Sequence, residues 1–174
     1  GAINEFMQPR DVLINAAGSA PGDLHKLFRS REHKSYHMEY GNSTMGYEIP
    51  ASLGVKMADP SREVYALVGD GTYLMMPTEI VTTIQEGCKV NIILVNNHGY
   101  ASIGSLSSSL GTSGFGTSYR MRDPRTGKLE GDFLPLDFAA NARGFGAVTY
   151  EPHTLAEFKD ALAQAKTADR TTLI

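Results

Sequence analysis

Cysteine and tryptophan are almost missing from this sequence: its 174 residues include one cysteine, Cys88, and no tryptophan. A single cysteine excludes an intramolecular disulfide, and this predicts a protein of a reducing compartment, the cytoplasm. Cys88 follows a glycine at the end of a helical pattern. We therefore interpret it as a packed thiol and not as a nucleophile.

Excess positive charge and long apolar runs are missing as well. The formal net charge is −3, which provides no basic surface for nucleic acid or for an anionic membrane. No apolar run approaches the ~20 residues that a membrane span needs, and no signal-peptide pattern opens the chain. Hydrophobic residues make up 41% and charged residues 20%, which is typical of a globular domain with an apolar core. We expect a cytoplasmic protein that binds neither nucleic acid nor membrane.

The two ends of the sequence differ from its middle. Residues 1–6 (GAINEF) precede Met7 and resemble a cloning remnant, so they are left out of the predicted fold. Residues 171–174 (TTLI) resemble the opening of a buried strand. We therefore expect residues 7–174 to form one domain of a longer enzyme, truncated at both ends.

Apolar runs alternate with segments of helical periodicity along the chain. This alternation predicts an α/β fold in which a parallel sheet is flanked by helices on both faces. Residues 104–135 are rich in glycine and serine and then in charge, and we expect a long functional loop there. The expected strands are 11–15, 35–39, 63–68, 91–95 and 146–150, and the expected helices are 46–57, 77–87, 136–143 and 154–166. Pro50 is expected in the first turn of the helix 46–57. The helix 154–166 is expected to begin with a capping box of Thr154 and Glu157 and to include Leu155 on its buried face.

Two polar side chains each follow a predicted buried strand. Asp70 stands between Gly69 and Gly71 after one strand, and Asn97 follows the next. Because the carboxyl ends of parallel strands meet at one edge of the sheet, we expect these side chains to converge where open α/β sheets bind ligands. Their oxygen atoms suit Mg²⁺ or Ca²⁺. The pattern therefore predicts a metal site that holds a diphosphate.

Main-chain groups next to Asp70 are candidates for the diphosphate itself. Gly69 and Gly71 allow a sharp turn and a close approach of a ligand. The N–H groups of Gly71 and Thr72 follow the carboxylate and could cap a phosphate. Ser19, on the turn after the first predicted strand, is a second candidate, with an ordinary solvated turn as the alternative.

The interval between the two polar residues is specific, because Asn97 comes 27 positions after Asp70 (97 − 70). A Gly-Asp-Gly turn followed at this interval by an Asn-Asn pair resembles the thiamine diphosphate enzymes, of the acetolactate synthase type. The resemblance implies that Asp70, Asn97 and the main-chain carbonyl of Gly99 bind Mg²⁺, which holds the diphosphate of the cofactor. The alternative is a structural turn with an unrelated asparagine pair.

Residues 38–54 (MEYGNSTMGYEIPASLG) carry the same resemblance. They are similar to the segment that receives the aminopyrimidine ring of the cofactor. The resemblance implies that the Ser43 carbonyl and the Met45 N–H pair with the pyrimidine edge, and that Met45 acts in catalysis as the apolar wedge that bends the cofactor. A thioether suits contact with an aromatic ring. In the alternative interpretation, Met45 is the first core residue of the following helix.

Several further stretches are similar to one group of this family, the trihydroxycyclohexane-dione hydrolases of inositol breakdown. This resemblance implies hydrolysis of the C–C bond of a cyclic 1,2-dione to a deoxy-uronic acid. Acetolactate synthase-like or 2-oxoacid decarboxylase activity is one alternative, and a non-catalytic cofactor-binding or assembly module is another. The stretches are 16–29, 37–56, 62–75, 113–120 and 137–150.

The resemblance also implies a contribution from outside this sequence. In this family, the glutamate that activates the cofactor ring belongs to a separate pyrimidine-binding domain, usually that of a partner subunit. We therefore expect these 174 residues to be inactive alone. The full-length enzyme is expected to be a homodimer or homotetramer.

Other polar residues fit a ligand site less well. His33, His37 and Glu39 lack the spacing of a soft-metal site. His37 and Tyr40 are candidate substrate contacts, with ordinary packing as the alternative. The charged residues of 120–128 are interpreted as a solvated loop, with binding of a substrate carboxylate as the alternative.

Overall fold

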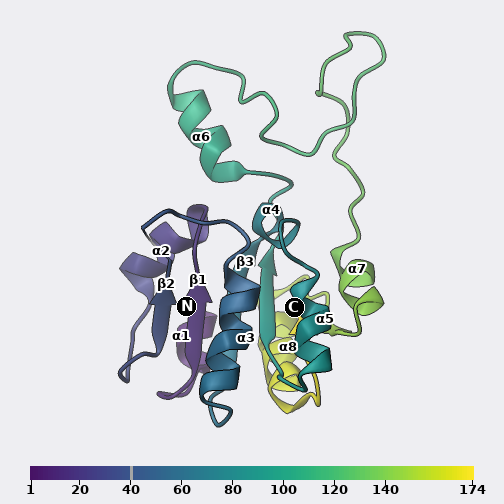
Figure 1. The fold of residues 1–174 in the computed structure, drawn as a ribbon. Coiled ribbons are helices and arrows are strands. Elements are labelled where there is room, and N and C mark those ends of the chain that lie inside the picture. The colour runs from purple at the N-terminus through teal and green to yellow at the C-terminus, as the bar shows by residue number, and fades with distance from the viewer. Residues whose placement is uncertain (40) are drawn as a thin grey trace.

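The computed structural model describes residues 1–39 and 41–174 (Figure 1). Within these residues, six parallel strands form one sheet in the order β2-β1-β3-β4-β6-β5. This confirms the predicted parallel sheet. The strands are β1 Val12–Asn15, β2 Tyr36–Met38, β3 Val64–Gly69, β4 Asn91–Val95, β5 Val148–Thr149 and β6 Thr172–Leu173.

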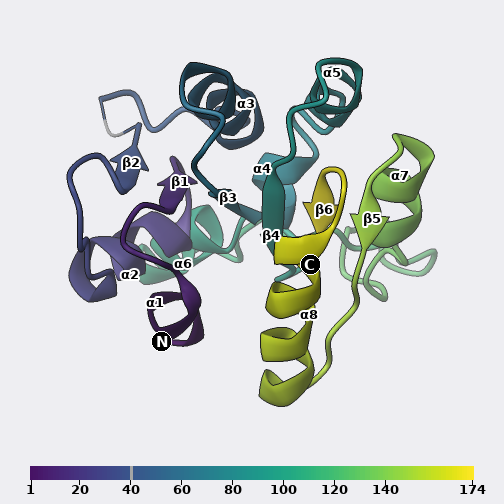
Figure 2. The same cartoon turned by 90° about the horizontal axis from the view of Figure 1, so that it is seen from below.

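Helices cover both faces of the sheet, as predicted. Figure 2 shows α3, α5 and α7 over one face and α1, α2 and α8 over the other. The helices are α1 Ala2–Phe6, α2 Ser19–Leu27, α3 Glu48–Ala58, α4 Asp70–Tyr73, α5 Glu79–Gln85, α6 Ala101–Ser109, α7 Phe138–Gly144 and α8 Leu155–Thr167.

Each face of the sheet has its own apolar core, because successive strand residues point to opposite faces. On one face, Ala66, Val68 and Ile92 pack in a buried cluster with residues of α3, α5 and α7. On the other face, Leu13 and Leu67 pack in a cluster with residues of α8. Burial on both faces explains why the central strands are continuous apolar runs and do not alternate with polar residues.

Two predicted helix starts are wrong by two residues. α3 begins at Glu48 and not at Gly46, although Pro50 lies in its first turn as expected. α5 begins at Glu79 and not at Pro77. Before it, the N–H groups of Ile80 and Val81 donate to carbonyls three residues earlier, so a tighter turn precedes the regular helix.

Three further expectations need correction. α6 lies partly inside the stretch expected to be a loop. Residues 1–6, left out of the predicted fold, include α1, and Phe6 packs edge-on against Tyr65 with ring centroids 6.4 Å apart. α8 has the predicted capping box of Thr154 and Glu157, but Leu155, expected on its buried face, is 64% exposed.

No helix in the described part of the chain combines the length and the apolar character that a membrane crossing requires. Tyr40, a candidate substrate contact, lies outside the described residues.

Candidate functional site

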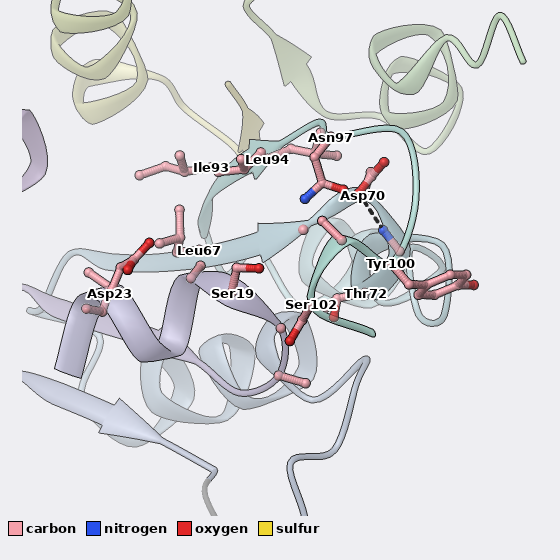
Figure 3. A pocket seen from close by; sticks show the side chains of 18 of the residues that line it. Ser19, Asp23, Leu67, Asp70, Thr72, Ile93, Leu94, Asn97, Tyr100 and Ser102 are labelled. Carbon is pink, nitrogen blue, oxygen red and sulfur yellow. Dashed lines mark hydrogen bonds between the residues drawn. The ribbon is translucent and has the colours of Figure 1, made fainter. Parts of the chain in front are cut away.

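The candidate site lies where the order of the strands changes direction. The chain passes from β1 outward to β2 and then returns to β3 on the other side of β1. Loops that leave adjacent strands at such a point diverge, and they leave a crevice at the carboxyl ends of the strands. The turn after β1, the start of α4 after β3 and the segment after β4 all meet there (Figure 3).

Asp70 is the buried centre of this crevice. Its side chain comes directly after β3 and is 0% exposed. One carboxylate oxygen accepts a hydrogen bond from the Gly71 N–H at 3.0 Å, and the other accepts from the Gly99 N–H at 2.8 Å. The carboxylate therefore joins the end of β3 to the segment that follows β4.

Asn97 and Gly99 bring two more oxygens to Asp70. The side-chain oxygen of Asn97 lies 3.2 Å from Oδ1 of Asp70 and 2.9 Å from the Gly99 carbonyl oxygen. Figure 3 shows the side chains of Asp70 and Asn97 turned toward each other. Adjacent ligands of an octahedral Mg²⁺ at 2.0–2.1 Å are separated by about 2.9 Å. The Asn97 oxygen is thus separated from each of the other two oxygens as neighbouring ligands of one small cation would be.

The amide of Asn97 has a second orientation with different chemistry. When the amide is turned over, its nitrogen donates to Asp70 Oδ1 and to the Gly99 carbonyl at the same two distances. Nitrogen and oxygen of an amide are told apart by their hydrogen-bond partners. One orientation therefore suits a bound cation, and the other allows the protein to satisfy these oxygens itself.

Gly99 holds its position because no larger residue fits there. Its φ is +150°, and a Cβ would overlap the Thr117 carbonyl oxygen and lie 2.8 Å from the Ser118 Cα. The Tyr100 N–H donates to the Thr117 carbonyl at 2.8 Å, and the Tyr119 N–H donates to the His98 carbonyl at 2.8 Å. The long segment after α6 thus pairs with the residues around Gly99 and holds this part of the chain beside Asp70 and Asn97.

Gly71 provides space in the crevice and not a special backbone angle. A Cβ on Gly71 would lie 2.7 Å from Cε1 of Tyr100, and no positive φ occurs at Gly69 or Gly71. The sharp glycine turn expected here is instead the start of α4. Tyr100 packs edge-on against Tyr119 with ring centroids 5.5 Å apart, so two aromatic side chains that no sequence motif indicated lie next to Gly71.

The turn before α3 presents the predicted ring-binding residues. Glu39 accepts hydrogen bonds from the N–H groups of Thr44 at 2.7 Å and Asn42 at 2.9 Å, and these N–H groups lower the pKa of the Glu39 carboxyl. Ser43 has a φ of +52°, a strained backbone of the kind found at ligand-binding sites. Met45 is half-buried in this turn and lies outside α3, so it is not a core residue of that helix.

One cavity of about 850 Å³ joins the crevice to the turn before α3. It is wide enough for a cofactor-sized molecule. Asp23 and Ser102 also line it, although no sequence motif indicated them. All nine predicted site residues line this cavity: Ser19, Ser43, Met45, Gly69, Asp70, Gly71, Thr72, Asn97 and Gly99.

The other polar candidates have partners elsewhere. His37 shares a 2.6 Å hydrogen bond with Tyr47, and the rings of His98 and Phe133 stack with centroids 4.5 Å apart. The Arg120 guanidinium lies over the same Phe133 ring, 4.1 Å from its centroid. No group of three or more His, Cys, Asp or Glu side chains in the described residues could hold a metal, so the candidate metal site depends on one carboxylate, one amide and one main-chain carbonyl.

These residues fit a diphosphate held by a divalent cation. The donors are hard oxygens, and hard oxygens are the ligands that Mg²⁺ selects. The Asn97 oxygen lies within 3.2 Å of Asp70 Oδ1 and of the Gly99 carbonyl oxygen, and Asp70 supplies the one carboxylate charge of this group. A cation between them would remove the contact between unprotonated oxygens and leave the remaining coordination positions to phosphate oxygens and water.

Comparison with known proteins agrees with this geometry. Residues 16–174 match the family model of the thiamine pyrophosphate enzyme, C-terminal TPP binding domain. Over all 174 residues the chain is 46% identical to the 3D-(3,5/4)-trihydroxycyclohexane-1,2-dione hydrolase of Clostridium tetani (strain Massachusetts / E88). It is 45% identical to the protein of the same name from Bacillus thuringiensis (strain Al Hakam). The chain spans 27% of the length of each relative.

The fold is also found in a solved structure. The thiamine diphosphate-dependent 4-hydroxybenzoylformate decarboxylase of Rhodococcus jostii RHA1 superposes with a TM-score of 0.81 at 24% sequence identity. The alignment covers 99% of this chain and 30% of the decarboxylase. Since the match to the family model covers residues 16–174, well over half of the chain, we conclude that the chain belongs to the thiamine pyrophosphate enzymes and corresponds to their C-terminal TPP-binding domain.

Proposed function

We propose that this chain is the cofactor-binding domain of a thiamine diphosphate- and Mg²⁺-dependent hydrolase that opens a cyclic 1,2-dione by cleaving a C–C bond. The observation that supports its role as a cofactor domain is the position of the Asn97 amide, within 3.2 Å of both Asp70 Oδ1 and the Gly99 carbonyl oxygen. The choice of substrate is supported by the 46% identity to a dione hydrolase across the whole chain.

In this proposal, Asp70, Asn97 and the Gly99 carbonyl hold Mg²⁺ at the carboxyl ends of β3 and β4. Ser19 and Gly69 lie on the same cavity and flank the path of the diphosphate. At the start of α4, the N–H of Thr72 would donate to a phosphate oxygen, and the N–H of Gly71, which donates to Asp70 Oδ1 at 3.0 Å, would lie next to the same phosphate.

Met45 and Ser43 serve the opposite end of the cavity. When bound, the cofactor supplies a carbanion at its thiazolium ring that can add to a carbonyl group. Met45 would hold the two rings of the cofactor in a bent arrangement, and the Ser43 carbonyl and Met45 N–H would orient the pyrimidine. The strained backbone at Ser43, with φ at +52°, suits a fixed pairing with a flat ring edge.

A dione hydrolase is favoured over the alternatives because the likeness reaches beyond the cofactor residues. The identity to the hydrolases extends over all 174 residues, whereas the 24% identity to the decarboxylase supports only the shared fold. An acetolactate synthase-like enzyme or a 2-oxoacid decarboxylase would use the same Asp70, Asn97 and Met45. A non-catalytic binding module would use them as well.

The proposal includes partners that complete the active site. A pyrimidine-binding domain, of the same or of a partner subunit, would supply the activating glutamate, so that these 174 residues alone are inactive. The exposed apolar side chains of Ile103 and Leu106, both on α6, line the cavity. They form an apolar surface that such a domain could cover. The proposal further includes a homodimeric or homotetrameric enzyme in the cytoplasm.

Two measurements test this function. Calorimetry of the chain with thiamine diphosphate, with and without Mg²⁺, should give binding that disappears when a chelator is added. The full-length enzyme should then cleave a cyclic 1,2-dione with Mg²⁺ and cofactor present and should leave pyruvate unchanged. Turnover of pyruvate in place of the dione would contradict the proposed substrate, and dione cleavage by the 174 residues alone would contradict the need for a second domain.

A further inference from the structure

A buried carboxyl group lies behind the cavity at Glu48, the first residue of α3. The residue is 0% exposed. One carboxyl oxygen accepts a hydrogen bond from the Ala17 N–H at 3.4 Å, and the other has no hydrogen-bond partner among the described residues. Burial raises the pKa of Glu48 to about 7. Such a group is unusual in a packed interior, and the proposed reaction does not use it.

Glu48 lies between the two turns that form the cavity. The carboxyl belongs to the residue that follows the turn before α3 and accepts from Ala17 in the turn after β1. Main-chain N–H groups oppose the effect of burial on its pKa: first that of Glu48 itself, then those of Ala17 and Ala16, after β1, and that of Gly46, before α3. The first turn leads to Ser19, and the second contains Ser43 and Met45, all of which line the cavity. The carboxyl therefore connects the predicted diphosphate end of the cavity with the predicted ring end.

The turn before α3 is closely packed on the side away from Glu48. Gly46 has a φ of +86°, and a Cβ there would lie 2.9 Å from Cγ of Met76 and 3.1 Å from Cβ of Met75. The turn before α3 is thus confined between the Met75–Met76 segment on one side and the Glu48 carboxyl on the other. A change at Glu48 would move this turn relative to Ala17.

A hydrocarbon side chain of the same size would avoid the penalty of burying a carboxyl. It would also leave the Ala17 N–H without an acceptor and remove the connection between the turns. The carboxyl thus carries a penalty for folding, and its contacts are with the two turns that face the cavity.

We propose that Glu48 is a positioning residue that holds the turn after β1 and the turn before α3 at a fixed separation, so that one cofactor molecule can contact both. This inference rests on the proposed function only in that both turns bind the cofactor; it does not depend on the substrate. Glu48 itself is not proposed to touch the cofactor.

The test separates folding from binding with two variants of the 174-residue chain. Glu48→Met keeps the volume without an acceptor, and Glu48→Gln keeps the acceptor for Ala17. At pH 8, Glu48→Met should unfold at the same temperature as the wild-type chain or higher. Its affinity for thiamine diphosphate with Mg²⁺, measured by calorimetry, should fall by about tenfold, the value of one lost hydrogen bond of ~1.4 kcal/mol.

The conservative variant and a matched control complete the experiment. Glu48→Gln should bind within about threefold of wild type, because its oxygen can accept from Ala17. Glu79→Met changes the first residue of α5 in the same way and should leave the affinity unchanged. In ¹H–¹⁵N spectra without cofactor, the Gly46 amide signal should move in Glu48→Met and remain near its wild-type position in Glu79→Met.

Three results would overturn the inference: unchanged cofactor affinity in Glu48→Met, a loss of affinity that only follows an equal loss of stability, or no binding by the wild-type chain. Failure of the proposed function gives a different result. If the variants behave as expected but the full-length enzyme opens no cyclic dione, the substrate is wrong and the role of Glu48 stands.

Discussion

The side-chain amide of Asn97 lies 3.2 Å from Oδ1 of Asp70, beyond the ends of two neighbouring strands, and in one of its two orientations the amide oxygen is the atom that faces Asp70. Two oxygens at this distance need either a proton or a cation between them. The Asn97 amide can supply the proton by turning over, and Mg²⁺ can replace it. The pair therefore has two arrangements, one with the ion and one without. The metal site can accordingly be tested both in the presence and in the absence of Mg²⁺.

Replacing the Asp70 carboxylate should abolish the dependence of cofactor binding on Mg²⁺. In Asp70→Asn, the affinity of the chain for thiamine diphosphate with Mg²⁺ should fall by about a hundredfold or more, because the only charged ligand of the site is lost. Calorimetry measures this directly. Asp169→Asn, which removes a carboxylate in an exposed pair with Arg170, is the control and should bind like wild type. Equal affinities of Asp70→Asn and wild type would exclude Asp70 as a ligand.

A second carboxylate at Asn97 should make folding depend on the cation. Asn97→Asp places two like charges about as close as the present oxygens and removes the amide donor. Without metal, this should lower the free energy of unfolding by about 1–2 kcal/mol, equal to a pKa displacement of about one unit. Millimolar Mg²⁺ should restore more stability to Asn97→Asp than to wild type, as urea denaturation would show. If Mg²⁺ does not change the free energy of unfolding of Asn97→Asp, residues 70 and 97 do not share one cation.

Replacing Gly99 with alanine should disturb both the fold and the Gly99 main-chain carbonyl that is proposed to bind Mg²⁺. Its φ of +150° and the overlap of a Cβ with the Thr117 carbonyl should reduce the free energy of unfolding by roughly 2–4 kcal/mol. Gly87→Ala is the matched control, since Gly87 has a φ of +60° with open space around its Cβ position, and should lose only about 1 kcal/mol. Similar losses in the two variants would show that the 117–118 segment does not confine Gly99.

The buried carboxyl of Glu48 should make stability depend on pH in a defined direction. Its pKa is raised from 4.5 to about 7, so the folded chain binds a proton more tightly than the unfolded chain does. This contribution is fully present below pH 4.5 and is lost as the pH rises through 7. Between pH 4.5 and pH 7, the free energy of unfolding of the wild-type chain should fall by roughly 3 kcal/mol relative to that of Glu48→Gln.

Urea denaturation of both proteins from pH 4.5 to pH 8 measures this difference. The amide side chain of the Glu48→Gln variant cannot ionise, and a constant offset between the proteins does not affect the slope. If the two curves run parallel over this range, the Glu48 carboxyl does not titrate as its burial requires.

Some features were predictable because they depend on local pattern alone. The buried strands before Asp70 and Asn97 are continuous apolar runs, and an α/β sheet brings their carboxyl ends to one edge. The capping box of Thr154 and Glu157 is likewise local, because its hydrogen bonds join residues three apart. The resemblance of the 38–54 stretch pointed to Ser43 and Met45, and both line the same cavity as Asp70.

Other features escaped prediction because local pattern is weak or misleading there. α6, with the sequence ASIGSLSSS, is rich in serine and glycine, has no side-chain cap and has no buried residue, so neither propensity nor periodicity marks it as a helix. Leu155 follows the spacing of its helix face but lies at the first turn, where it is 64% exposed.

The buried strands, the family, and the positions of Asp70 and Asn97 after neighbouring strands could be predicted from the sequence alone, because these depend on the spacing of apolar and turn residues. Which groups oppose one another is known from the folded chain only: the Asn97 amide beside Asp70, the tyrosine ring against Gly71 and the Glu48 carboxyl next to Ala17. Such contacts join residues far apart in the chain, and their distances follow from packing, which no local pattern encodes.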